Sequence, residues 1–140
     1  MKNPDYWKDS LDYLTRIDKK LGVIISHHKD YSISSRGEAY ETLIRSIVGQ
    51  QVSVKAAASV WNKIIDLIPI IEPNKVLSTN KEKLKNCGLS KQKTQYILNI
   101  SEHFNINKII DDTYWEGRTY LSIYEELITI KGIGPWTAEM

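Results

Sequence analysis

The sequence has only one cysteine, Cys87, among its 140 residues. A single thiol excludes an internal disulfide, and it excludes an iron–sulfur cluster or zinc site built from four cysteines of this chain. The sequence also lacks an apolar run of the roughly 18 residues that a membrane-spanning helix needs. Charged residues such as Lys2 and Asp9 crowd the first segment, which does not resemble a secretory signal. We therefore expect a cytoplasmic protein.

A large excess of charge of one sign is absent as well. The 19 Lys and Arg residues nearly balance the 17 Asp and Glu residues, and the formal net charge is +2. A net charge this small does not by itself indicate a polyanionic partner. The distribution is uneven, however, because residues 75–93 hold six lysines and a single acid, Glu82. This segment is either a solvated face or a surface that attracts anions.

No segment alternates apolar and polar residues over a useful length, so a β-sheet is not expected. Apolar residues instead recur every three or four positions, as they do on the buried face of a helix. Ser53, Asn80 (or Thr79) and Ser90 are expected to cap helices, and Gly49 is expected to relax the chain before Ser53. The predicted helices lie at about residues 6–22, 43–48, 54–68, 80–87, 91–104 and 119–130.

The last ten residues carry the most specific local pattern. The final predicted helix runs into Gly132-Ile133-Gly134, and Pro135 stands where the first turn of another helix is expected. Two glycines around one aliphatic residue predict a tight turn whose backbone N–H groups can bind a phosphate. This is the pattern of a helix-hairpin-helix that binds the DNA backbone, although a plain glycine cap also gives Gly-x-Gly.

A second block precedes the hairpin, where Gly49-Gln50-Gln51-Val52-Ser53 separates two predicted helices. In this order and separation, the two blocks resemble the helix-hairpin-helix (HhH-GPD) DNA glycosylases, and within them the DNA-3-methyladenine glycosylase II family. The resemblance covers about residues 36–140. It implies an enzyme of base excision repair that bends DNA, flips out an alkylated purine such as 3-methyladenine, and hydrolyses its N-glycosidic bond.

The resemblance also sets the expected architecture. We expect a compact, orthogonal all-α bundle that forms one domain over residues 1–140. Within it lie a leading helical segment over 1–35, a helical body over 36–130 and the helix-hairpin-helix over 127–140, at the C-terminal end. The implied partner is double-stranded DNA that contains alkylated bases. No membrane is expected, the protein is expected to be a monomer, and in a bacterium it would associate with the nucleoid.

The resemblance assigns DNA contacts to both blocks. The hairpin amides, with that of Trp136 or Thr137, would hold phosphates of the damaged strand. Gln51 falls where the family places the residue that enters the duplex and fills the vacated stack. Alternatively, the two glutamines only satisfy backbone groups between helices. The full predicted set of DNA-binding residues is Gln50, which braces the loop, Gln51, Ser53, Lys131, Gly132, Ile133, Gly134 and Thr137.

Trp136 distinguishes between branches of this family. The bifunctional branch carries a lysine at this position, which attacks the sugar and forms a Schiff base, whereas an indole cannot do so. The resemblance therefore implies a monofunctional enzyme. An aromatic wall also favours a cationic alkylated purine through cation–π attraction. Trp136 and Met140 are predicted to line the base pocket, and the alternative for Trp136 is a place in the core behind the hairpin.

No catalytic residue is expected among these 140 positions, because the family's essential aspartate follows the second hairpin helix and would lie past Met140. This leaves a fragment, or a non-catalytic helix-hairpin-helix DNA-binding module, as the alternative to an active enzyme. A helical protein-interaction domain with an incidental Gly-Ile-Gly turn is a third reading. The acids near the hairpin lie outside the family's motif: Asp111 and Asp112, which are expected to cap a short helix, and Glu125, Glu126 and Glu139.

No organic cofactor and no iron–sulfur cluster are expected. The backbone carbonyls of Ile128, Ile130 and Gly132 match positions that commonly coordinate a structural sodium or potassium ion in this family. Such a cation would lie beside the bound phosphate and attract it. The side chains of Ile128 and Ile130 can pack in the core at the same time, because the carbonyls act separately.

Overall fold

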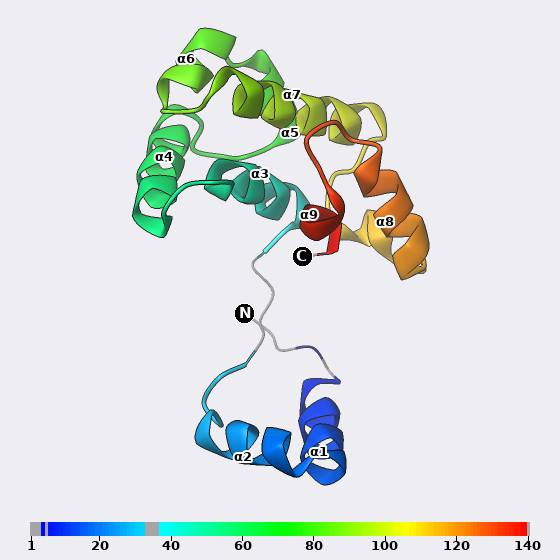
Figure 1. Ribbon diagram of the computed structural model, residues 1–140. Helices are drawn as coiled ribbons and strands as arrows, with labels where there is room; N and C mark the ends of the chain where they lie inside the picture. The colour runs from blue at the N-terminus through cyan, green and yellow to red at the C-terminus, as the bar shows by residue number, and fades with distance from the viewer. Residues whose placement is uncertain (1–3, 5, 33–36, 140) are drawn as a thin grey trace. The chain divides into compact units, whose positions relative to one another are not determined.

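The computed structural model describes residues 4, 6–32 and 37–139. Within these ranges all regular elements are helices, which confirms the all-α prediction. The chain forms two compact units, Met1–Gly37 and Glu38–Met140 (Figure 1). The expectation of one domain over residues 1–140 stays a prediction. No helix in the described ranges is long and apolar enough to cross a membrane.

The first unit consists of two helices, α1 (Trp7–Ile17) and α2 (Lys19–His27). The sequence predicted one helix ending near Gly22, but Asp18 interrupts it. Asp18 takes an extended conformation, and its carboxylate accepts hydrogen bonds from the amides of Lys20 and Leu21 at 2.8 and 3.1 Å. This local side-chain bond caps α2 and competes with continuation of α1. The apolar spacing continues across the break, so periodicity alone does not reveal it.

The second unit begins with α3 and contains the remaining elements. Its helices are α3 (Ala39–Gly49), α4 (Val54–Leu67), α5 (Pro73–Ser78), α6 (Lys81–Asn86), α7 (Lys91–Ile106), the 3₁₀ helix η1 (Asp112–Trp115), α8 (Tyr120–Ile128) and α9 (Pro135–Glu139). Helix α5 was not predicted from the sequence, since its six residues are too few to show a helical period.

Side chains cap these helices where the sequence predicted. The Ser53 hydroxyl accepts from the Ala56 amide at 3.2 Å, and the Asn80 carbonyl oxygen accepts from two amides at the start of α6. Ser90 does the same for α7, and Asp111 caps η1. These bonds satisfy amides that have no partner within the helix.

Helix α7 contacts several other helices of the second unit. It packs against α3, α5 and α6 (Figure 1), and its residues Ile97 and Ile100 are completely buried. A buried hydrogen bond of 2.7 Å joins Ser101 of α7 to the Tyr40 hydroxyl of α3. Helix α7 thus links α3, α5 and α6 within the unit.

Candidate nucleic-acid interface

The hairpin between α8 and α9 is a tight turn held from inside by two isoleucines. Ile130 and Ile133 are 4% and 5% exposed, and the Ile133 amide donates to the Ile130 carbonyl at 2.9 Å. The following chain enters α9 at Pro135, as expected for a residue that lacks an N–H. The predicted turn is confirmed.

Gly132 is the position in this turn where no other residue fits. Its φ of +118° is a left-handed conformation that favours glycine, and an added Cβ would lie 2.4 Å from Cγ of Tyr96. The close neighbour is therefore an aromatic ring of α7. Gly134, by contrast, has open space around it and no positive φ.

Backbone N–H groups are available on this turn. Those of Gly132, Gly134, Trp136 and Thr137 donate to no acceptor within the described residues, which leaves them free for a ligand. Ile133 requires a correction, because its amide is used in the turn bond to Ile130. The Thr137 side chain is buried, so this residue can offer only its backbone amide to a ligand.

The side chains around the turn differ in exposure. Trp136 is 66% exposed, so the alternative of a core tryptophan behind the hairpin is wrong. Lys131 is exposed as well, while its carbonyl accepts a hydrogen bond from Asn99 of α7 at 2.9 Å. Met140, the other predicted pocket residue, lies outside the described residues.

Two of the three carbonyls assigned to a monovalent cation are free to accept a ligand. The Ile128 and Gly132 oxygens receive no hydrogen bond within the described ranges, whereas that of Ile130 accepts from Ile133. No group of three or more His, Cys, Asp or Glu side chains with metal-binding geometry occurs in the same ranges. Neutral carbonyl oxygens are hard ligands, so the donors present fit an alkali cation.

The second block forms the turn between α3 and α4. Gly49 ends α3 in helical conformation, and the unusual residue is instead Gln51, with φ of +57°. The expectation that Gly49 relaxes the chain is thus corrected, because a glutamine takes up the left-handed conformation. The Gln51 side chain is exposed, and Gln50 before it is half-buried. Gln51 is therefore presented at the surface by a constrained turn.

Lys93 of α7 holds this turn, a role that the sequence analysis missed. Its ammonium donates to the carbonyls of Val48 and Gln50 at 2.8 and 2.7 Å. Burial lowers the pKa of Lys93. The sequence counted Lys93 as one of six lysines in a basic segment, and no local signal identifies a partner more than 40 residues away. Lys75, Lys81, Lys83 and Lys91 of that segment are exposed.

Helix α7 thus carries the contacts to both blocks. Lys93 binds the turn around Gln51, the Tyr96 ring packs on Gly132, and Asn99 binds the Lys131 carbonyl. Tyr96 follows Lys93 by three positions, so the two residues are roughly 4.5 Å apart along the helix axis. Two blocks far apart in the sequence are therefore attached to one helix, one turn apart.

The acids near the hairpin have structural partners. Glu126 of α8 accepts hydrogen bonds from His103 at 2.8 Å, from Arg118 at 2.5 Å and from Tyr114 at 3.1 Å. Asp112 accepts from the Ala39 amide at 2.9 Å. The Glu126 contacts join α8, η1 and α7, so Glu126 and Asp112 have structural roles.

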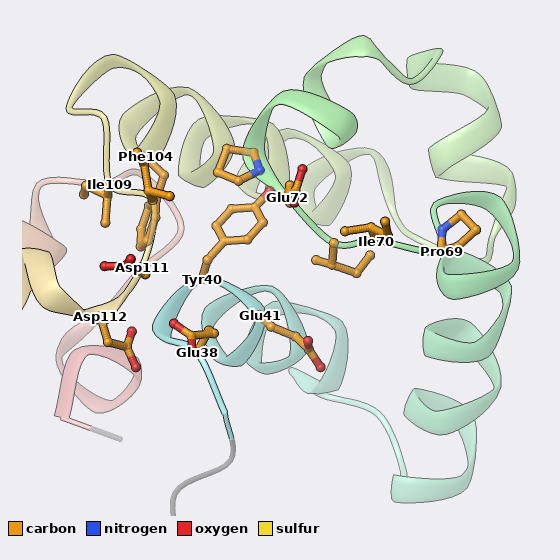
Figure 2. A pocket seen from close by; sticks show the side chains of 13 residues that line it. Glu38, Tyr40, Glu41, Pro69, Ile70, Glu72, Phe104, Ile109, Asp111 and Asp112 are labelled. Carbon is orange, nitrogen blue, oxygen red and sulfur yellow. The ribbon is translucent and has the colours of Figure 1, made fainter.

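A cavity of about 380 Å³ lies elsewhere in the second unit, between α3, the α4–α5 connection and the end of α7 (Figure 2). Tyr40 and Phe104 form part of its wall. Among the described residues no lysine or arginine lines it, and the carboxylates there disfavour phosphate. The carboxylates at this cavity belong to Glu38, Glu41, Glu72, Asp111 and Asp112.

Known proteins resemble this chain in sequence and in structure. The alkylbase DNA glycosidase-like protein mag2 of Schizosaccharomyces pombe is 30% identical over 99% of this chain, and DNA-3-methyladenine glycosylase 1 of the same organism is 28% identical over 87%. The solved structure of S. pombe 3-methyladenine DNA glycosylase (Mag1) in complex with abasic DNA matches 94% of the chain, with a TM-score of 0.82 and 26% identity.

This chain spans 68% and 55% of the lengths of the two sequence relatives, and 66% of the solved chain. Residues 44–133, which include the turn around Gln51 and most of the hairpin, match the family described as HhH-GPD superfamily base excision DNA repair protein. The chain therefore belongs to the HhH-GPD superfamily of base excision DNA repair proteins.

Proposed function

We propose that this protein is a monofunctional DNA glycosylase that removes alkylated purines, such as 3-methyladenine, from double-stranded DNA. The observation that carries the proposal is the attachment of the hairpin and the Gln51 turn to one helix, α7. The relatives named above are 3-methyladenine glycosylases or a protein like them, and one was solved with abasic DNA.

Each part has a role in this proposal. The free amides of Gly132 and Gly134 hold phosphates of the damaged strand, with Lys131 nearby. A sodium or potassium ion on the Ile128 and Gly132 carbonyls adds positive charge beside the phosphate. The Gln51 side chain enters the duplex and fills the space left by the flipped base, which offsets the cost of unstacking.

Trp136 supplies the selectivity. Its exposed indole can stack on the extruded purine, and a methylated purine with a positive charge gains cation–π attraction of about 0.5–2 kcal/mol over a neutral one. Because an indole forms no Schiff base, the reaction ends with an abasic site. Glu126, Asp111 and Asp112 are held by structural contacts and are not assigned as catalytic.

Release of 3-methyladenine from methylated DNA by the full-length protein tests the activity. We expect free base and an intact abasic strand, with no adduct trapped by borohydride. Binding of DNA without release of any alkylated base would contradict the enzyme and favour a non-catalytic DNA-binding module.

Gly134→Glu tests the phosphate contact. Gly134 has open space around it, so the variant should fold, and its carboxylate would repel the DNA backbone. Gly134→Gln is the matched control, because it has nearly the same shape and no charge. We expect DNA affinity to fall much further for Glu than for Gln, and equal affinities would contradict the contact.

A further inference from the structure

The end of α3 leaves backbone carbonyls that need donors. The last turn of an α-helix has no internal partners for its carbonyl groups, and a cation at this end also complements the helix dipole. Here the Lys93 ammonium binds the Val48 and Gln50 carbonyls at 2.8 and 2.7 Å. The donor comes from α7, so it fixes α3 and the following turn to another helix.

The turn that Lys93 holds contains an unfavourable backbone conformation. Gln51 has a φ of +57°, which residues with a Cβ rarely adopt. Such a conformation persists only where the surrounding structure imposes it. Lys93 binds the carbonyl that directly precedes Gln51, so it is placed to impose this conformation.

Lys93 differs from the other lysines of its segment. Its ammonium is half-buried on two neutral carbonyls, and no carboxylate within the described residues lies in ion-pair contact with it. Lys91, two residues earlier on the same turn of α7, is exposed, and its ammonium has no hydrogen bond or ion pair within the described residues. The partly desolvated ammonium of Lys93 is therefore bound by the carbonyls of the turn, whereas that of Lys91 carries the same charge without such a partner.

We propose that Lys93 is a positioning residue, which holds the Gln50–Gln51 turn in the conformation that presents Gln51 to the DNA duplex. This inference rests on the proposed function, because it assigns Lys93 a part in base flipping. It gives α7 a direct role in setting where Gln51 stands relative to the hairpin at Gly132.

The experiment uses the full-length protein and a duplex with a tetrahydrofuran abasic site opposite 2-aminopurine, whose fluorescence rises when it is unstacked. Lys93→Met keeps an apolar stem but removes the donors, and Lys91→Met is the matched control for charge. We expect Lys93→Met to reduce the fluorescence response to the level of Gln51→Ala. Affinity should fall about tenfold, because DNA binding must then order a turn that the two Lys93 hydrogen bonds no longer hold.

A double variant tests whether the two residues act together. If Lys93 acts through Gln51, Lys93→Met with Gln51→Ala should bind no more weakly than either single variant, whereas independent contacts would add. Lys93→Arg, which keeps the charge and several donors, should restore part of the response. An unchanged fluorescence response in Lys93→Met, or additive losses in the double variant, would overturn the proposal.

Hydrogen exchange separates this inference from the proposed function. In the free protein, Lys93→Met should speed exchange of the Gln50 amide, which donates to the Ile47 carbonyl at 3.3 Å, and Lys91→Met should not. Unchanged exchange would overturn the role of Lys93 even if DNA is bound. If the unmodified protein binds no abasic duplex, the proposed function fails while the exchange result still decides the role in the free protein. Loss of the whole fold in Lys93→Met would also overturn it, since Lys93 would then support the domain and not the turn.

Discussion

At the residue scale, Gly132 and Gln51 use the left-handed region in opposite ways. Gly132 has no side chain and lets the Tyr96 ring lie directly on the backbone. Gln51 also has a positive φ but keeps its side chain, which is exposed at the surface. Gly132 therefore allows close packing. Gln51 keeps its amide side chain, although its backbone conformation is unfavourable.

Gly132→Ala should therefore destabilise the protein strongly. The new Cβ would meet both Cγ and Cβ of Tyr96, at 2.4 and 2.6 Å, atoms too near the α7 backbone to swing aside. We expect a loss of about 2–4 kcal/mol in the free energy of unfolding, from strain and overpacking together. Urea denaturation measures it, with Gly134→Ala as the control that should change stability by less than about 1 kcal/mol.

At the element scale, Glu126 joins three elements by accepting bonds from α7, η1 and the chain that leads into α8. Its side chain is 16% exposed. Burial alone would raise the pKa of Glu126, but hydrogen bonds from His103, Arg118 and Tyr114 outweigh it and lower that pKa. The junction therefore depends on an ionised carboxylate.

The sign of this pKa change gives a pH dependence. Because the carboxyl is more acidic in the folded state, its contribution is present above the unfolded pKa of about 4.5 and is lost as the pH falls through the folded pKa. Glu126→Gln should lower the free energy of unfolding by about 2–4 kcal/mol at pH 7, because it leaves Arg118 without its charged partner. The difference from wild type should narrow below pH 4.5.

Urea denaturation at pH 7 and in acid checks this expectation. Glu125→Gln, an exposed neighbour on the same helix, is the control and should change little at either pH. A difference for Glu126→Gln that stays constant across the two pH values would contradict the role of the ionised carboxylate.

Elements with local signals were predictable from sequence. Ser53, Asn80 and Ser90 cap the helices that they were expected to cap, because an N-cap bond joins residues two or three positions apart. The break between α1 and α2 at Asp18 was not predictable, since the apolar period continues through it. The partnership of Lys93 with Gln50 is also invisible locally, because it depends on the packing of α7 against α3.

At the scale of the whole molecule, the buried core lies within one unit. Every buried side chain in the described ranges belongs to residues 40–137, and neither α1 nor α2 contains a buried residue. The core, the turn around Gln51 and the hairpin are therefore parts of the unit that begins at Glu38.

Removal of residues 1–37 should leave the rest folded. Since that deletion takes away no buried side chain among the described residues, we expect the free energy of unfolding to change by about 1 kcal/mol or less. Circular dichroism during thermal unfolding measures it against the intact chain. Loss of cooperative unfolding in the shortened protein would show that the first unit contributes to the core.

The contacts along α7 also restrict how the sequence can change length. One residue inserted between Lys93 and Tyr96 would rotate the later part of the helix by about 100° and move Tyr96 away from Gly132. An insertion near the exposed Gly117, in contrast, shifts neither contact. The number of residues between the Gln51 turn and the hairpin can therefore change, provided that the rotational phase of α7 between Lys93 and Tyr96 is kept.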